Sequence, residues 1–150
     1  MFFYYRIFLE KKLFNKNLQV FVFLSLVNIT GLTFATDFSV TSSTSSQIEF
    51  GANNDTLTVS GAGSINYGST KTVKSSSRSG VTITNAGTIS GSDDTIYLYS
   101  SNNATITNTG TISSSDDTIY LYSSNNATIT NSGSITGSDD TIYLHSSDDA

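Results

Sequence analysis

The sequence predicts an all-β fold: a parallel β-solenoid of about four 23-residue coils that follows an N-terminal signal peptide. Three observations lead to it: a repeat of fixed period, short stretches in which apolar and polar residues alternate, and turn residues at constant places between them. The chain of 150 residues contains neither cysteine nor proline. We therefore expect a fold held by stacked strands rather than by disulfides.

The repeat fills the second half of the chain. Residues 82–104, 105–127 and 128–150 read TITNAGTISGSDDTIYLYSSNNA, TITNTGTISSSDDTIYLYSSNNA and TITNSGSITGSDDTIYLHSSDDA, and each segment starts 23 residues after the last. A looser copy, LTVSGAGSI from Leu57 to Ile65, aligns with VTITNAGTI from Val81 to Ile89 at an offset of 24. A fixed period of this length is typical of solenoids. We expect an N-terminal cap or linker over 36–56 and coils over 57–80, 81–103, 104–126 and 127–149.

Each repeat contains three stretches with the two-residue period of a β-strand, such as Ala104 and Ile106 alternating with Thr105 and Thr107. Turn residues separate them: Asn-Xaa-Gly, then Ser-Asp-Asp, then Ser-Ser-Asn-Asn. Equivalent strands of successive coils should pair in parallel at a spacing of about 4.8 Å. The residues expected to point inward are Val81, Ile83, Ile89, Ile96, Leu98, Ala104, Ile106, Ile112, Ile119 and Leu121.

The N-terminus has the pattern of a secretory signal peptide over residues 1–35. Four basic side chains, Arg6, Lys11, Lys12 and Lys16, precede an apolar run from Leu18 to Val27, and small residues at Thr33 and Ala35 fit a cleavage site after Ala35. An uncleaved membrane anchor is the alternative, because apolar residues continue to Phe34. Asn28, Thr30 and Gly31 interrupt that run, so we favour the signal peptide.

Charge is divided unevenly along the chain. Every basic residue lies at or before Arg78, whereas the remainder carries four Asp-Asp pairs. Nucleic-acid binding needs clustered lysine and arginine, so nucleic acid is excluded as a partner. We also expect the chain to be part of a longer protein, because Ala150 stands where a further coil would begin.

The Asn-Xaa-Gly-Thr-Ile-Ser steps, as in TNAGTISGS over residues 84–92, give the chain a family resemblance. From about Leu57 to Ala150 it resembles passenger domains of Gram-negative autotransporters. The resemblance implies a parallel β-helix that is secreted to the cell surface, often for adhesion to a host or environmental surface, glycan or protein. It also implies a C-terminal outer-membrane barrel, and the present chain shows no run of barrel strands.

Two sets of residues should form columns along the solenoid. Asn85, Asn108 and Asn131 are expected to form an asparagine ladder at one corner, each amide bonding its counterpart in the next coil. An outward strip of rings is expected from Tyr97, Tyr99, Tyr120, Tyr122, Tyr143 and His145. Such a strip can contact sugars or proteins, but stacking between coils is a sufficient structural reason for it.

The paired aspartates recur in register at Asp93, Asp94, Asp116, Asp117, Asp139 and Asp140. Stacking brings their charges close together, and calcium takes several oxygen ligands of this kind. Aspartate is also a favoured turn residue, and the turn role is the simpler interpretation. We predict no cofactor.

Paired carboxylates also raise the possibility of a polysaccharide-cleaving enzyme. Against it, the pairs are equivalent to one another, and His145 is the only histidine. An active site needs one constellation with distinct environments, so we predict no catalytic residues.

Ice binding is the other alternative, because Thr-Ile-Thr recurs around Ile83, Ile106 and Ile129, and stacked threonines of this kind present a flat face to ice in some β-solenoids. At the offset of 24, however, the first coil replaces this motif with Leu57-Thr58-Val59. The sequence thus favours an exported, non-enzymatic surface protein, with ice or carbohydrate binding as the alternative.

Overall fold

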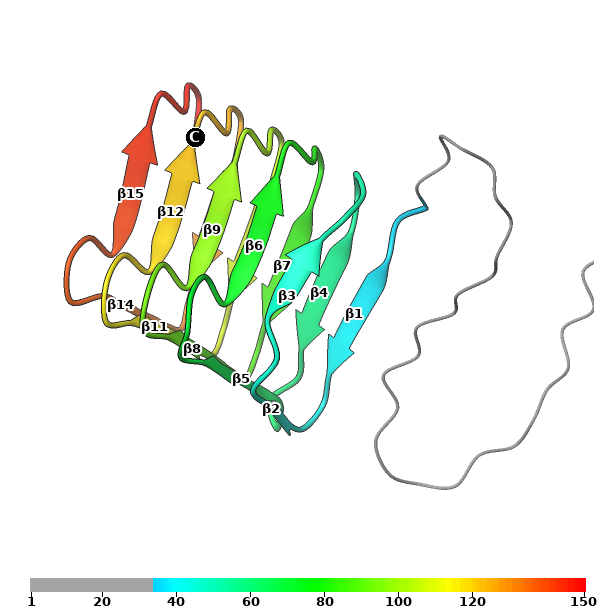
Figure 1. Cartoon of the computed structure of the whole chain (residues 1–150), viewed down its shortest axis with the longest axis vertical. Helices are drawn as coiled ribbons and strands as arrows, with labels where there is room; N and C mark the ends of the chain where they lie inside the picture. Colours follow the sequence, from blue (N-terminus) through cyan, green and yellow to red (C-terminus); the bar gives the residue numbers. More distant parts are fainter. Residues whose placement is uncertain (1–33) are drawn as a thin grey trace, which may run out of the picture. The chain divides into compact units, whose positions relative to one another are not determined.

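The structure is a computed structural model that describes residues 34–150, and these residues form a parallel β-solenoid of five stacked coils (Figure 1). Each coil contributes one strand to each of three parallel sheets. The first sheet contains β1 (Asp37–Val40), β4 (Thr56–Val59), β7 (Thr82–Asn85), β10 (Thr105–Asn108) and β13 (Thr128–Asn131). The second contains β2 (Ser43–Thr44), β5 (Ser64–Tyr67), β8 (Thr88–Gly91), β11 (Thr111–Ser114) and β14 (Ser134–Thr136). The third contains β3 (Ile48–Phe50), β6 (Val73–Ser76), β9 (Ile96–Tyr99), β12 (Ile119–Tyr122) and β15 (Ile142–His145).

The core is a column of aliphatic side chains inside the coils. In β10 and β12, buried Ile106, Ile119 and Leu121 alternate with partly exposed residues, as expected for strands that face the core with one side only. All ten residues predicted to point inward are at most 1% exposed. The predicted solenoid, its parallel pairing and its 23-residue spacing are therefore confirmed.

The structure has one coil more than the repeat indicated. Residues 37–50, within the segment expected to be a cap or linker, form β1, β2 and β3 and pair in parallel with the second coil. Asp37 lies opposite Thr56, only 19 residues later, so this coil is shorter than the others. Its burial pattern is nevertheless the same, with Ile48 and Phe50 on the inner side of β3.

The alignment of the second coil was wrong in its first strand. Leu57 pairs with Ile83 and Val59 with Asn85, an offset of 26, whereas Ile65 pairs with Ile89 at the predicted offset of 24. The difference arises at the corner, where residues 60–63 separate β4 from β5 but only residues 86–87 separate β7 from β8. A shift of two residues keeps every side chain on the same face of a strand, so Leu57 and Val59 point inward with either offset. The alternation of apolar and polar residues therefore cannot distinguish an offset of 24 from one of 26.

Left-handed backbone conformations shape the corner that follows the third sheet. Ser100, Ser123 and Ser146 have φ between 49° and 50°, and Asn103, Asn126 and Asp149 have φ between 54° and 55°. Asparagine and aspartate tolerate this region better than most residues because their short side chains bond locally. The Ser-Ser-Asn-Asn segments at residues 100–103 and 123–126 therefore turn the chain from the third sheet back to the first.

Residues 1–33, which include nearly all of the predicted signal peptide, lie outside the described residues. Among residues 34–150, no helix is long and apolar enough to cross a membrane.

Candidate binding face

The asparagine column lies inside the corner between the first and second sheets. The Asn85 Nδ2 group donates to Asn108 Oδ1 at 2.8 Å, and Asn108 Nδ2 donates to Asn131 Oδ1 at the same distance. Each Nδ2 also donates to a backbone carbonyl of the next coil, Thr111 O or Ser134 O. Asn85 and Asn108 are fully buried, so these bonds hold neighbouring coils together.

The predicted aromatic strip lies on the outer face of β9, β12 and β15. One column contains Tyr97, Tyr120 and Tyr143, with ring centroids 5.2 and 4.8 Å apart. The second contains Tyr99, Tyr122 and His145, with centroids 5.0 and 4.5 Å apart. The two columns lie 6.4 to 6.5 Å apart, and every ring pair is within 18° of parallel.

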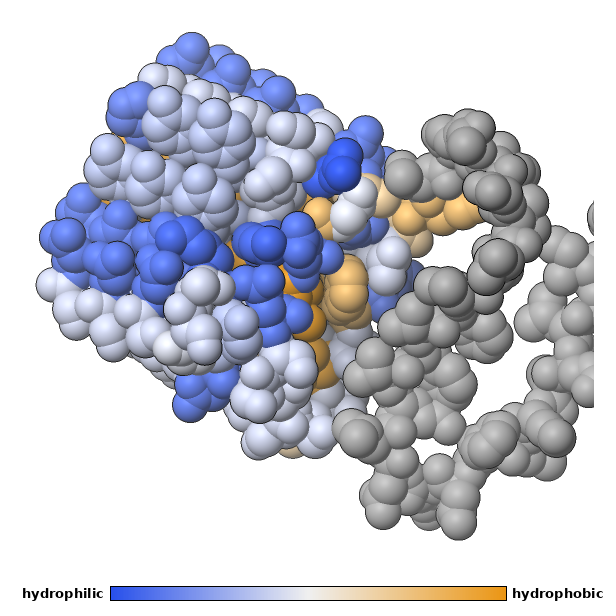
Figure 2. All heavy atoms as spheres, viewed as in Figure 1, coloured by the Kyte–Doolittle hydropathy of each residue, from blue (hydrophilic) through white to orange (hydrophobic). Residues whose placement is uncertain are grey.

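We call these six rings the aromatic face. Because parallel pairing fixes each ring above its counterpart, the face is rigid and flat. Figure 2 shows this side of the molecule, with a strongly hydrophilic band beside paler residues over β9, β12 and β15. None of the six rings is buried and Tyr99 is 40% exposed, so the ring edges are open to a partner.

The paired aspartates lie in the corner that leads into the third sheet, just before β9, β12 and β15. We call Asp93, Asp94, Asp116, Asp117, Asp139 and Asp140 the acidic row. Two groups, Asp93–Asp94–Asp116 and Asp116–Asp117–Asp139, bring carboxylate oxygens within 4.8 Å of one another. That geometry is compatible with a cation that has oxygen ligands, and calcium stays the alternative to the turn role of these aspartates.

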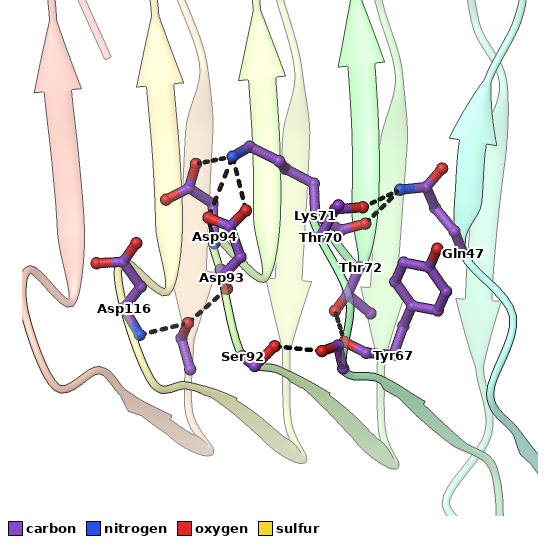
Figure 3. Close-up of polar contacts among 11 residues, drawn as sticks. Gln47, Tyr67, Thr70, Lys71, Thr72, Ser92, Asp93, Asp94 and Asp116 are labelled. Carbon is purple, nitrogen blue, oxygen red and sulfur yellow. Dashed lines mark hydrogen bonds and ion pairs between the residues drawn. The ribbon is translucent and has the colours of Figure 1, made fainter.

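At the N-terminal end of the acidic row, the ammonium group of Lys71 approaches two carboxylates (Figure 3). Its Nζ lies 2.9 Å from Asp93 Oδ2, 3.3 Å from Asp94 Oδ2 and 5.4 Å from the centroid of the Tyr97 ring. Sequence reasoning did not assign Lys71 a role. The available signal was the segment Lys71-Thr72-Val73, which lies 23 residues before Asp94-Thr95-Ile96 and so places a lysine in the column of the second aspartate.

The pKa values along the acidic row follow these contacts. The hydrogen bond from Lys71 lowers the pKa of Asp93 below its usual value, although partial burial opposes the shift. Burial raises the pKa of Asp94 despite the opposing attraction of Lys71. Burial also raises the pKa of Asp117, and neighbouring Asp116, Asp139 and Asp140 add to that shift while the Asp140 amide opposes it. Negative charge is therefore best compensated where Lys71 stands.

The first sheet presents a second regular surface, made of threonine. With the observed register, Thr56-Leu57-Thr58 stacks on Thr82-Ile83-Thr84, so the Thr-Xaa-Thr pattern that appeared interrupted in this coil is intact. The eight threonines, in register over four coils, are Thr56, Thr58, Thr82, Thr84, Thr105, Thr107, Thr128 and Thr130. None of them is buried.

A shallow depression over β2 and β5 is lined by Ser43, Thr44, Ser45, Ser64 and Asn66. Its lining offers hydroxyl and amide groups and no side chain that titrates near neutral pH.

Comparisons with known proteins found no relative of this chain: no family model, no curated protein and no solved structure matches it.

Proposed function

We propose that this protein is an exported, non-enzymatic surface protein, the passenger region of an autotransporter-like adhesin, and that its aromatic face contacts the target. The observation that carries the proposal is the pair of parallel ring columns on the outer side of β9, β12 and β15. Rigid aromatic side chains supply large contact areas at low entropic cost, to sugars and proteins alike.

The sequence supports export and surface location. Residues 1–35 have the basic, apolar and small-residue segments of a signal peptide, and the Asn-Xaa-Gly-Thr-Ile-Ser steps resemble autotransporter passengers. The aspartate pairs recur in register and the sequence has a single histidine, a pattern that favours a binding role over catalysis.

Export is tested by fractionating cells of the native host and treating intact cells with protease, using an antibody against the repeats. We expect surface digestion and a mature chain that begins at Thr36. A full-length product that stays in the cytoplasm would refute the export proposal.

Adhesion is tested by measuring how well cells that display the full chain attach to host-derived or abiotic surfaces. Tyr120→Ser together with Tyr122→Ser should reduce attachment severalfold, because hot spots in interfaces are enriched in aromatic residues. The matched control, Thr111→Ser with Ser113→Ala on β11, alters the same coil on another face and should leave attachment unchanged. Equal attachment by both variants would refute the role of the aromatic face.

Ice binding is a second candidate, and the four threonine rungs in register favour it. If the threonine face binds ice, the protein will produce thermal hysteresis, and Thr84→Lys with Thr107→Lys will abolish it by breaking the flat surface. Absence of hysteresis and of crystal shaping in the unmodified protein would eliminate this function.

A further inference from the structure

The two ring columns of the aromatic face end differently on their N-terminal side. In the third sheet, β3 and β6 precede β9 (Figure 1). In β6, Lys74 occupies the column position of Tyr97, and Ser76 occupies that of Tyr99. The first column therefore continues with a long side chain, whereas the second continues with a short one.

The short side chain leaves one face of the Tyr99 ring uncovered. Tyr99 stacks on Tyr122 of the following coil, with centroids 5.0 Å apart and planes 8° from parallel, so its other face is turned towards Ser76. Within the part of the chain that the structure describes, no ring or cation is stacked on that face, whereas Lys71 Nζ lies 5.4 Å from the centroid of Tyr97. Tyr99 is 40% exposed, while Tyr122, which has a ring on each side, is exposed to a smaller extent.

The open space beneath this ring continues into the first coil. Phe50 of β3 lies opposite Ser75 of β6, so one residue further along Gly51 comes next to Ser76. Gly51 and Ser76 are both exposed, and a Cβ atom added at Gly51 would meet no heavy atom within 4 Å. We call this arrangement, in which the ring of Tyr99 stands above Ser76 and Gly51, the Tyr99 step.

Polar groups of both kinds flank the Tyr99 step. The neighbouring column, which lies 6.4 Å away where Tyr97 and Tyr99 stand side by side, contains Lys74 and Glu49. Lys74 Nζ lies 3.0 Å from Glu49 Oε2, and the two side chains are 33% and 62% exposed. An ammonium group offers donors, a carboxylate offers acceptors, and the hydroxyl group of Ser76 offers both.

We propose that the Tyr99 step binds a neutral pyranose ring of a glycan, stacked on the uncovered face of Tyr99 as Tyr122 is stacked on the other. The inference rests on the proposed binding role of the aromatic face and names the class of its target. The electron-rich face of an aromatic ring attracts the weakly positive C–H groups of a sugar. The hydroxyl groups around the sugar need donors and acceptors, which Lys74, Glu49 and Ser76 supply.

The flanking groups favour a neutral sugar over two other ring-shaped ligands. An aromatic side chain of a protein partner could stack on Tyr99, but it would give Lys74, Glu49 and Ser76 at most one polar group to bond. A charged sugar would gain little, because Lys74 and Glu49 balance each other's charge. A neutral pyranose uses both the ring face and the hydrogen-bonding groups.

The test is a titration of the full chain with methyl β-glucopyranoside and with methyl β-galactopyranoside, followed by NMR of the tyrosine rings and by saturation transfer to the sugar. We expect saturable binding of at least one glycoside, with transfer to its C–H protons and larger shifts at Tyr99 than at Tyr143. Absence of saturable binding by both glycosides would overturn the proposal. Binding of N-acetyl-tryptophan amide at Tyr99, without glycoside binding, would overturn it in favour of a protein partner.

Two substitutions remove the Tyr99 step in different ways. Tyr99→Ser removes the ring and should weaken glycoside binding roughly threefold to tenfold, the value of one aromatic contact. Ser76→Leu leaves all six rings in place but covers the free face of Tyr99 with an aliphatic side chain, and should abolish binding. The matched controls are Tyr143→Ser, which removes another ring of the aromatic face, and Ser115→Leu, which adds the same side chain at another exposed position.

Both controls should bind the glycosides like the unmodified protein. Equal weakening by Tyr99→Ser and Tyr143→Ser would overturn the proposal, because the sugar would then contact the ring edges rather than one ring face. Undiminished binding by Ser76→Leu would overturn it too, since the face of Tyr99 would then not be the contact.

The two proposals can fail separately. Cell attachment that depends on Tyr120 and Tyr122, with no glycoside binding at Tyr99, would refute only the sugar site. Glycoside binding that depends on Tyr99, in cells whose attachment is insensitive to all of the tyrosine variants, would refute the adhesive role and leave the sugar site standing.

Discussion

Single buried polar residues in this solenoid depend on partners in adjacent coils. Asn108 is fully buried, accepts from Asn85 and donates to Asn131, so both sides of its amide are satisfied. Asn85 begins the column, because the residue below it is Val59, and its Oδ1 atom is buried without a hydrogen-bond partner. The first asparagine of the column therefore lowers folding stability through its unpaired oxygen, whereas each later one raises it through its hydrogen bonds.

The first prediction concerns the middle of that column. Asn108→Ala should lower the free energy of unfolding by about 2–3 kcal/mol, because it removes several buried hydrogen bonds and leaves carbonyl groups unpaired. Asn131→Ala, at the exposed end of the column, should cost less than about 1 kcal/mol. Urea unfolding of both variants measures the difference. Equal costs would show that the column contributes no more inside the solenoid than at its end.

The second prediction concerns Lys71 and pH. Its pairing lowers the pKa of Asp93, so the stabilisation is present above the usual carboxyl value of 3.8 and is lost as pH falls through the lower value of the folded state. The pKa of Lys71 is raised: burial alone would lower it, but the hydrogen bond to Asp93 and the attraction of Asp94 outweigh burial. The pairing is therefore also lost as pH rises through that raised value, above 10.5.

Lys71→Met should accordingly cost about 1 kcal/mol at pH 7, since the ion pair is partly exposed. The cost should shrink towards zero at pH values well below 3.8, where Asp93 is protonated in both proteins. Chemical denaturation of the two proteins across this range measures it. A cost that does not change with pH would mean that Lys71 stabilises the coil through packing of its stem alone.

At the scale of the element, the turns between strands are constrained by the close approach of neighbouring coils. A Cβ atom at Gly110 would lie 2.1 Å from Gly87 O, and one at Gly133 would lie 2.1 Å from Gly110 O. The Asn-Xaa-Gly turns thus stack glycine on carbonyl, and only a residue without a side chain fits. Gly61, in the longer corner of the second coil, has its nearest neighbour at 3.9 Å and is free of this constraint.

The third prediction follows from this stacking. Gly110→Ala should cost about 3 kcal/mol or more, because the backbone must separate two coils to make room for one methyl group. Gly61→Ala, the matched control in the same type of corner, should be neutral or slightly stabilising. Thermal denaturation of both variants measures the costs. A neutral Gly110→Ala would show that the corners of adjacent coils lie further apart than the structure places them.

How far the sequence predicts each element depends on how well the repeat is preserved. From Val81 onward the copies differ little, so strand positions, buried residues and ring columns follow directly from the 23-residue period. The second coil was placed two residues out in its first strand because an even shift keeps Leu57 inward. The first coil was missed because its corners differ in length and its strands share only the burial pattern.

The binding face illustrates the same limit. The six rings and six aspartates were identified from their recurrence. Lys71 belongs to the degenerate second coil and occurs once, so periodicity alone gave it no weight. Its contact with Asp93 and Asp94 depends on the 23-residue register between β6 and β9, which the offset of 24 predicted for this coil misses by one residue.

At the scale of the whole molecule, each coil contacts only its neighbours, so stability should rise from the ends towards the middle of the stack. Burial already shows this gradient. Ile119 in β12 is fully buried between its partners in β9 and β15, whereas Ile142, its direct partner in β15, is 42% exposed. Leu144 in the same strand is 49% exposed.

The fourth prediction tests this gradient with one substitution at two heights of the same column. Ile119→Ala should cost about 3–4 kcal/mol, because it leaves a cavity in a closed core, and Ile142→Ala less than about 1 kcal/mol. Urea unfolding of both variants, repeated over a range of protein concentrations, measures the two costs. If each coil is stabilised only by its neighbours, the two costs must differ, because within residues 34–150 Ile142 has a coil on one side only. Equal and concentration-dependent costs would mean that another copy covers β15 in solution, and that the stacking which joins the coils also joins the chains.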